Sequence, residues 1–192
     1  MREVAGERAI VMAIHPRYAA RIYAGEKTAE LRRASPSSRV RMAFIYETAP
    51  ASAITGVMLV DEVCRASPTL AWRQFSRRLC ISQQEFLEYL RGCRAATVYK
   101  VSEAVKFPRH VPLVKATRLR RPPQSYSYLD RTTSSKVLRS AALPKETLES
   151  SGGASFPWQS TLRQWEERAS GLEAFGRTAT SSISSSAPSV RT

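Results

Sequence analysis

Residues 25–33 read Gly25-Glu26-Lys27-Thr28-Ala29-Glu30-Leu31-Arg32-Arg33, and this stretch decides how the N-terminal half of the chain folds. Glycine accepts the left-handed conformation that follows many helix ends, so Gly25 marks the end of a helix. Beyond it, Glu30 and Arg32 share one face of an extended segment, and Ala29 and Leu31 share the other. The stretch therefore predicts a turn into a strand with one apolar face and one charged face.

The residues before this stretch predict a strand and a helix. Residues 9–14 form an apolar run typical of a buried strand, and His15 and Pro16 follow it. Proline is favoured in the first turn of a helix, where its missing N–H costs nothing. Apolar residues then recur at helical spacing over residues 16–24. The predicted order is a strand, a helix and a second strand over residues 28–33.

The later part of the chain is predicted to be mostly strand. We expect strands over residues 40–47, 53–64 and 95–107, and helices over residues 68–78, from Ser82 onward and over 134–142. With many strands and few βαβ units, this order predicts an α+β, mainly β fold with a mostly antiparallel sheet.

Several positions carry more specific structural expectations. Ser82 is followed three residues later by Glu85, which predicts a capping box. Residues 40–47 alternate as a half-buried strand does, and Gly56 predicts a bulge or bend in the next strand. Pro108 and Pro112 are expected to end the strand that begins near residue 95. Residues 113–130 are expected to be an extended basic and aromatic segment.

Charge and composition divide the chain into three parts. We predict one domain over residues 8–142, an extension with a short helix over 143–175, and a disordered Ser/Thr-rich tail over 176–192. Residues 145–192 hold five basic and five acidic residues, so the remainder carries the whole net charge of +14. Residues 106–139 alone hold nine basic residues and one acidic residue. Such a surface favours a polyanionic partner, and the alternative is a solubilising surface from an Arg-rich proteome.

Composition also argues against several classes of protein. Cys64, Cys80 and Cys93 are odd in number and lack Cys-x-x-Cys spacing, which favours a reducing cytoplasm and argues against a zinc site. His15 and His110 are far apart in the sequence, so we expect no metal and no cofactor. The sequence contains neither an 18-residue apolar run nor a signal-peptide pattern, so we expect a cytoplasmic protein with no membrane partner.

Two groups of residues carry the chemistry expected of a nucleotide site. In the first, Lys27 supplies a compact cation for phosphate, and Arg32 supplies a planar fork for phosphate or a base edge. Glu30 can accept from a base amino group or hold the two cations in place. The alternative is a solvated charged strand face. In the second, Arg120 and Arg121 offer phosphate contacts, and Tyr126 is either a surface for a base or part of the core.

The pattern of Gly25, Lys27, Glu30 and Arg32 resembles the Gly-x-Lys-x-x-Glu-x-Arg signature of the ASCH domain family. The resemblance covers roughly residues 8–130, and it includes blocks at residues 14–19, 44–50 and 122–126. It implies a PUA-like β-barrel with peripheral helices, a link to RNA, and a cleft lined by the signature. His15, where relatives often carry Lys, is expected at the rim of that cleft.

The resemblance implies two functional classes. The first is an RNA-binding or nucleic-acid-binding protein that binds through a basic cleft and regulates transcription or translation. The alternative is a small amidohydrolase acting on acylated pyrimidine nucleosides, for which Lys27 and Glu30 would be the catalytic candidates. Such enzymes carry Thr three residues after the signature Lys and an acid in the middle of the chain. Here Glu30 takes the first place and residues 77–80 supply no acid, so we expect binding and not catalysis.

Overall fold

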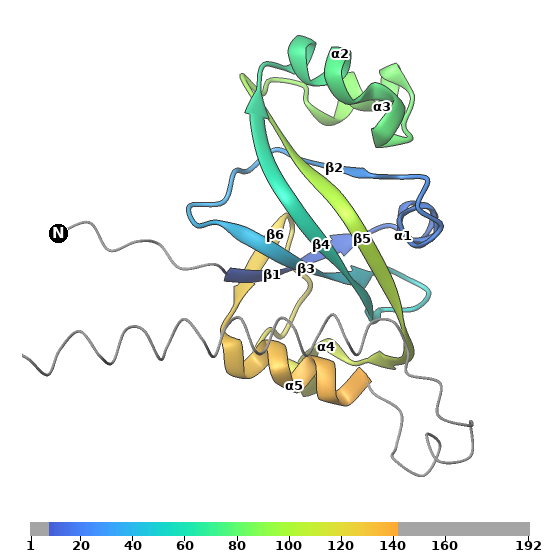
Figure 1. Ribbon diagram of the computed structural model, residues 1–192, viewed down its shortest axis with the longest axis vertical. Coiled ribbons are helices and arrows are strands. Elements are labelled where there is room, and N and C mark those ends of the chain that lie inside the picture. The colour runs from blue at the N-terminus through green and yellow to red at the C-terminus, as the bar shows by residue number, and fades with distance from the viewer. Residues whose placement is uncertain (1–7, 142–192) are drawn as a thin grey trace, which may run out of the picture. The chain divides into compact units, whose positions relative to one another are not determined.

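The computed structural model describes residues 8–141, and the predictions for residues 143–175 and 176–192 lie outside them. Figure 1 shows the elements in chain order. They are β1 (Arg8–Ile14), α1 (Pro16–Tyr23), β2 (Ala29–Arg32), β3 (Val40–Glu47), β4 (Ala53–Ala66), α2 (Pro68–Leu79), α3 (Gln83–Tyr89), β5 (Ala96–Val111), α4 (Leu113–Ala116), β6 (Tyr126–Leu129) and α5 (Arg131–Ala141). None of the helices within the described range is long and apolar enough to span a membrane.

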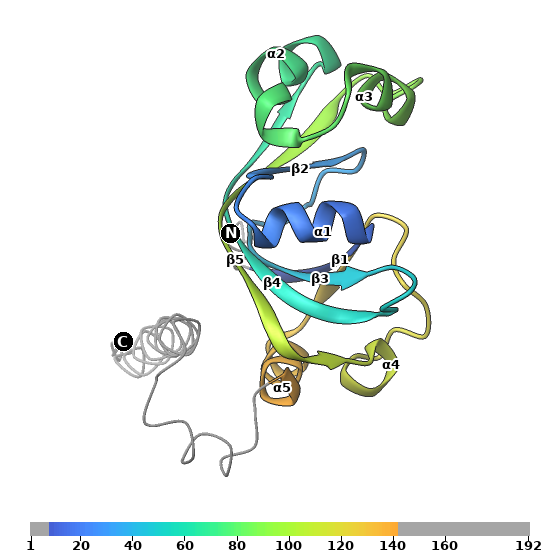
Figure 2. The same cartoon turned by 90° about the vertical axis from the view of Figure 1, so that its right-hand side faces the viewer.

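The six strands form a single curved sheet in the order β2-β5-β4-β3-β1-β6 (Figure 2). The β1–β3 pair is parallel, and the other four pairs are antiparallel. The mixed α/β class with a mostly antiparallel sheet agrees with the sequence. The predicted closed barrel is not confirmed, because β2 and β6 are the two edges of the sheet and do not pair with each other.

Side chains, and not a main-chain ladder, connect the two ends of this sheet. Nη2 of Arg32 on β2 donates to the carbonyl oxygen of Ala13 on β1 at 2.9 Å. The hydroxyl of Tyr126 on β6 donates to the carbonyl of Ser35 in the β2–β3 loop at 3.0 Å. The hydroxyl of Tyr128 accepts the backbone N–H of residue 37 at 2.8 Å and that of residue 38 at 3.1 Å. Side-chain hydrogen bonds thus link the two ends of a sheet that stays open.

Strands β4 and β5 form a long ribbon that connects the α2–α3 end of the domain to the α4–α5 end (Figure 1). The expected irregularity at Gly56 is confirmed, because the β4–β5 register shifts between Ile54 and Gly56. The expectation that Pro108 ends the last long strand was wrong. Strand β5 continues to Val111, because Pro108 lies in the stretch opposite this shift, where the missing N–H breaks no regular ladder.

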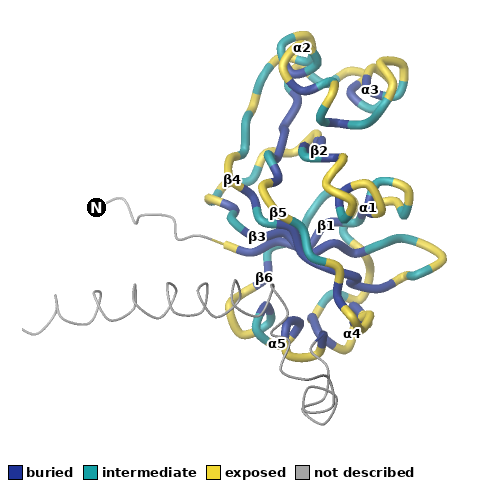
Figure 3. Tube along the Cα trace, turned by 45° about the vertical axis from the view of Figure 1, so that its right-hand side comes forward, coloured by how far each residue is buried: buried dark blue, intermediate teal, exposed yellow. Residues whose placement is uncertain are grey.

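Two apolar clusters pack against opposite faces of β5, since Tyr99 belongs to one and the adjacent Val98 to the other. Figure 3 shows the centre of the sheet as buried. The first joins α1 to the sheet centre and includes Ile10, Ile22 and Tyr99. The second joins α2 and α3 to β2, and includes Leu31 and Phe86. Strand β3 was expected to be half-buried, but both of its faces are covered, since Ala43 and Ile45 belong to the first cluster and Phe44, on the other face, packs against Phe107.

Most helix boundaries follow the capping residues. The predicted capping box is present, since the Ser82 hydroxyl accepts the N–H of Glu85, and the Glu85 carboxylate accepts the N–H of Ser82. The segment 113–130 differs from the expected extended chain, because α4 and a four-residue β6 form within it. Helix α5 begins at Arg131, and the Asp130 carboxylate accepts the N–H of Thr133 at 2.6 Å.

We expect Gly56→Ala to lower the free energy of unfolding by about 1–3 kcal/mol. A Cβ at this position would overlap the carbonyl oxygen of Val105 and the phenol ring of Tyr23, and a paired strand cannot shift cheaply. Urea denaturation measures the change. Ser102→Ala, on the exposed side of the same ribbon, is the control and should change stability by less than about 0.5 kcal/mol. Equal midpoints for the two variants would contradict the close approach at Gly56.

Candidate functional site

A tight turn after α1 places Lys27 beside the sheet. Gly25 adopts φ +74°, as its place after the helix predicts, and its N–H donates to the carbonyl of Ile22 at 3.0 Å. The N–H of Lys27 then donates to the carbonyl of Arg21, also at 3.0 Å. These bonds fix the backbone just before β2, so the Lys27 side chain starts from a well-defined position.

Lys27, Glu30 and Arg32 form one buried charged cluster. The Lys27 ammonium lies 3.3 Å from one Glu30 carboxylate oxygen, and Nη1 of Arg32 lies 3.1 Å from the other. Only 2%, 5% and 8% of the three residues is exposed, respectively. The alternative of a solvated charged face is therefore excluded. Two cations share one carboxylate, so the cluster carries an uncompensated positive charge, which favours an anionic ligand.

The two cations of this cluster also hold neighbouring elements. The Lys27 ammonium donates to the carbonyl of Leu79, at the end of α2, at 2.6 Å. It also lies 5.3 Å from the centre of the Tyr18 ring, within the range of a cation–π contact. Arg32 reaches Ala13 on β1, as described above. The cluster therefore fixes the positions of α2, α1 and β1 relative to β2.

Three buried polar atoms at Arg32 and beside it lack a hydrogen-bond partner in the described part of the chain. Nε of Arg32, the Thr97 hydroxyl and the Tyr99 hydroxyl are all buried, and none of them has a hydrogen-bond partner among the described residues. Arg32 pairs with Thr97, and Glu30 pairs with Tyr99, across the β2–β5 ladder. Paired residues share a face of the sheet, so these side chains extend to the same side. Buried polar groups normally have partners, which makes this side of the sheet a candidate for a polar ligand.

Burial and charge act in opposite directions on Arg32. Burial lowers the pKa of the Arg32 guanidinium, but the charge of Glu30 and the phenols of Tyr89 and Tyr99 outweigh it, so the net pKa is raised. Burial raises the pKa of the Tyr99 phenol, and the nearby Tyr126 adds to that rise. Arg32 is thus a permanent cation, and Tyr99 is a neutral hydroxyl beside it.

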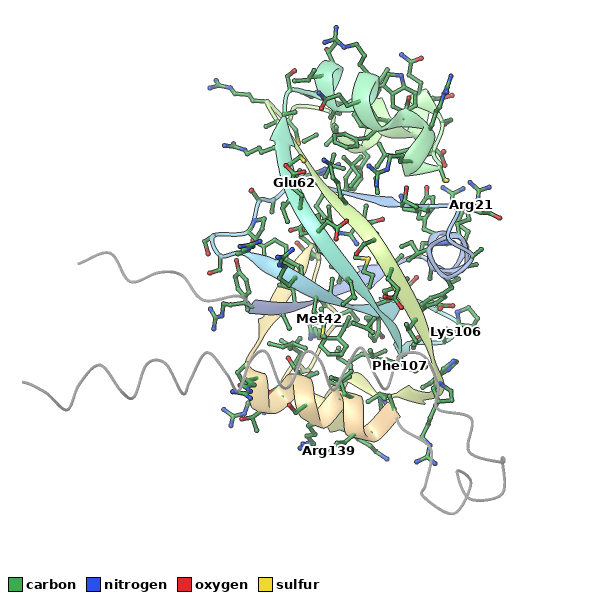
Figure 4. The ribbon with its side chains drawn as sticks, viewed as in Figure 1. Arg21, Met42, Glu62, Lys106, Phe107 and Arg139 are labelled. Atoms are coloured by element: carbon green, nitrogen blue, oxygen red, sulfur yellow. The ribbon has the colours of Figure 1, made fainter. Side chains whose placement is uncertain are left out.

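Two contacts next to the cluster join α1 to α3 and to the end of α2. Arg17 forms an ion pair with Glu85, and Nη1 of Arg21 donates to the carbonyl of Cys80 at 2.9 Å. Figure 4 shows Arg21 on α1, on the same side as the end of α2. The hydrogen bond from the Ser82 backbone, followed by that from Arg17, lowers the pKa of Glu85 to about 2. Glu85 therefore stays ionised over the physiological range, and its ion pair with Arg17 connects α3 to α1 at the surface.

The remaining predicted site residues lie outside the buried cluster. His15 is exposed and caps α1 by accepting the N–H of Arg17 at 3.3 Å. Arg120 and Arg121 are exposed on the loop before β6. Tyr126 is half-buried, packs against the first apolar cluster and stacks edge-on against Tyr128 at 5.5 Å between ring centres. Of the two alternatives for Tyr126, a surface for a base or a part of the core, this packing agrees with the second.

The sequence did not identify Thr97 and Tyr99 as members of the site. The sequence predicted the strand that contains them. It did not predict that this strand pairs with β2, because pairing between distant segments leaves no local pattern in the sequence. Within residues 8–141 there is no group of three or more His, Cys, Asp or Glu side chains that could hold a metal ion. The polar groups of the site are therefore two hydroxyls, a guanidinium, an ammonium and a single carboxylate.

Comparison with known proteins matches this arrangement to one family. The profile of the ASCH domain matches residues 12–108. An ASCH domain-containing ribonuclease from Zymomonas mobilis subsp. mobilis is 25% identical over 144 residues, which cover 72% of this chain and 95% of that protein.

Solved structures from the same organism share the fold. The crystal structure of ASCH from Zymomonas mobilis superposes with a TM-score of 0.63 at 24% identity, covering 69% of this chain and 94% of that one. A crystal structure of a ZmASCH mutant protein gives a TM-score of 0.64 at 23% identity, covering 69% and 95%. The likeness extends over nearly the whole length of these proteins.

Proposed function

Because this chain belongs to the ASCH domain family, we propose that it binds RNA and holds one nucleotide at the Lys27–Glu30–Arg32 cluster. The observation that carries the proposal is the uncompensated positive charge of this buried cluster, beside an Arg32 Nε that has no partner in the described part of the chain. A phosphate matches that charge, and a base edge matches the hydroxyls of Thr97 and Tyr99. Glu30 orients both cations.

The exposed surface around the site supports a longer ligand. Residues 8–141 contain 24 basic and nine acidic residues, a net charge of +15. Strand β6 starts at Tyr126, opposite Met12, so the loop with Arg120 and Arg121 leads to the end of β1 where His15 follows. This loop would hold phosphates next to the nucleotide in the cluster. Regulation of transcription or translation is the role that such binding would serve.

A second candidate function is RNA cleavage, which the Zymomonas mobilis ribonuclease favours as a relative. Two cations next to a phosphodiester would stabilise the charge that develops during cleavage. The amidohydrolase alternative has weaker support. The Lys27 ammonium donates to a carbonyl and faces a carboxylate, which are the contacts of a bound cation and not those of a base that removes protons.

We expect the full chain to bind single-stranded RNA with an affinity that falls steeply with salt, because neutralised phosphates release counterions. Arg120→Ala/Arg121→Ala should weaken binding and reduce the slope of log K against log salt by about 0.7 for each lost phosphate contact. Fluorescence anisotropy at several salt concentrations measures both effects.

The matched control for this experiment is Arg73→Ala/Arg77→Ala on α2. It removes the same charge from another exposed surface. Equal losses in the two double variants would point to diffuse attraction and argue against a contact by the loop. Wild-type binding that does not depend on salt would contradict the proposal of a polyanionic ligand. Release of acetate from an acylated cytidine at enzymatic rates would instead assign the chain to the amidohydrolases.

A further inference from the structure

A pocket of about 320 Å³ lies between the β2–β3 loop and β4, outside the buried cluster. Its walls combine two serine hydroxyls, two carboxylates, a guanidinium and apolar groups, supplied by Ser35, Pro36, Ser38, Arg39, Val40, Asp61, Glu62 and Val63. In Figure 4 the labelled Glu62 marks this part of β4. Ligand pockets in proteins start at about 300 Å³, so this one suits a single small ring system and not a large ligand.

An irregularity in β4 shapes one wall of the pocket. Val60 pairs with Val101 and Glu62 pairs with Lys100, so Asp61 is an extra residue in the ladder. Bulges of this kind redirect a side chain and are frequent next to functional sites. Glu62 is engaged by Lys100 at 2.5 Å. Asp61 is exposed, and its backbone carbonyl accepts Nη1 of Arg41 at 3.2 Å. Its carboxylate can therefore point into the pocket.

The opposite wall is held in place before any ligand binds. The Tyr126 hydroxyl donates to the carbonyl of Ser35, and the Tyr128 hydroxyl accepts the N–H groups of Ser37 and Ser38. Burial would raise the pKa of Tyr128, but the bonds from these two serines lower it. A loop fixed in this way loses little conformational entropy when a ligand enters.

The pocket and the charged cluster lie along one row of the sheet. Glu30 pairs with Tyr99, and Tyr99 pairs with Val63, so the three residues are neighbours across β2, β5 and β4. Two strand spacings separate Glu30 from Val63, which is about 10 Å. A phosphate held at the cluster and a base held in the pocket would therefore lie about 10 Å apart.

We propose that this pocket binds one base of the RNA, and that it selects guanine through Asp61. The proposal rests on the RNA binding proposed above. A carboxylate offers two acceptor oxygens, and among the four bases guanine alone presents two adjacent donors, N1–H and the N2 amino group, on its Watson–Crick edge. The hydroxyls of Ser35 and Ser38 supply donors for the base oxygen, and Pro36 and Val63 contact its faces.

The test compares two RNA ligands on three full-length proteins. The ligands are an oligouridine with one guanosine and the same oligonucleotide with inosine, which lacks the N2 amino group. We expect wild-type protein to bind the guanosine ligand about 10- to 150-fold more tightly, because inosine loses one hydrogen bond to a charged acceptor, which is worth about 1.5–3 kcal/mol. Asp61→Asn should remove this preference. Glu103→Gln changes the net charge equally at an exposed site on β5 and should retain it.

The possible outcomes test the guanine assignment of the pocket separately from the proposed RNA binding. Loss of the preference in Asp61→Asn alone supports the assignment. Equal binding of both ligands by wild-type protein, or a preference that survives in Asp61→Asn, overturns the pocket assignment and leaves RNA binding standing. Absence of RNA binding in all three proteins overturns the proposed function itself. Binding of an arginine-containing peptide that competes with RNA and requires Asp61 would make the pocket a protein-binding site and overturn the assignment to guanine.

Discussion

A variant with Glu30→Ala is expected to lose about 3–5 kcal/mol of unfolding free energy, because it leaves two buried cations without a counter-charge. Lys27 and Arg32 share that carboxylate at 3.3 and 3.1 Å, and both are almost completely buried. The loss is a large share of the roughly 5–15 kcal/mol typical of a whole domain. Urea denaturation followed by circular dichroism measures it.

Two further variants define what Glu30 contributes. Glu30→Gln keeps the shape and an acceptor oxygen but removes the charge, so its loss should lie between those of wild type and Glu30→Ala. Glu103→Gln, at an exposed position, should leave the stability within about 0.5 kcal/mol of wild type. A Glu30→Ala variant as stable as wild type would show that Lys27 and Arg32 reach water, contrary to their burial.

A Lys27→Met variant is expected to bind RNA about 10- to 150-fold more weakly, the cost of one charge-assisted hydrogen bond of about 1.5–3 kcal/mol. Methionine fills a similar volume, and Glu30 then balances Arg32, so the fold should tolerate this change better than the loss of Glu30. Arg32→Lys, which keeps the charge but removes the Nε and the planar fork, should weaken binding for a different reason. Fluorescence anisotropy with single-stranded RNA measures both variants.

Lys115→Met is the matched control for Lys27, because it removes one exposed charge from α4 and leaves the cluster intact. The same RNA should be followed on a denaturing gel. If wild-type protein cleaves it and Lys27→Met does not, the second candidate function, a ribonuclease, replaces simple binding. Full affinity in Lys27→Met, with Lys115→Met equally unchanged, would exclude the cluster as the nucleotide site.

The sequence predicted those parts of the fold that depend on local chemistry. Pro16, Gly25 and the pair Ser82 and Glu85 define helix ends through contacts within a few residues, and the structure places them as expected. The irregularity near Gly56 was predicted as well, because a glycine inside a long strand often marks a bulge or a bend. Family membership followed from four positions between Gly25 and Arg32, now supported by a profile match over residues 12–108.

The rest depends on contacts between distant segments. Alternation along residues 28–33 predicts a charged face but not that α1 and α2 bury it, as they do for Lys27. Pro108 predicts the end of a strand, and only the register shift between β4 and β5 explains why β5 continues past it. The pocket beside Asp61 forms only where the β2–β3 loop meets β4, and no motif marks it. Long-range pairing therefore sets the limits of what the sequence alone could predict.

The side-chain link between the two ends of the sheet, made by Arg32, Tyr126 and Tyr128, has an evolutionary consequence. A hydrogen-bonded barrel has a width set by the number of strands and their stagger, which change only by large steps. Here three side chains link the ends of the sheet, so a single substitution can change the distance between those ends while every strand keeps its partner. Related proteins that share this sheet can thus accept ligands of different size without a change in strand pairing.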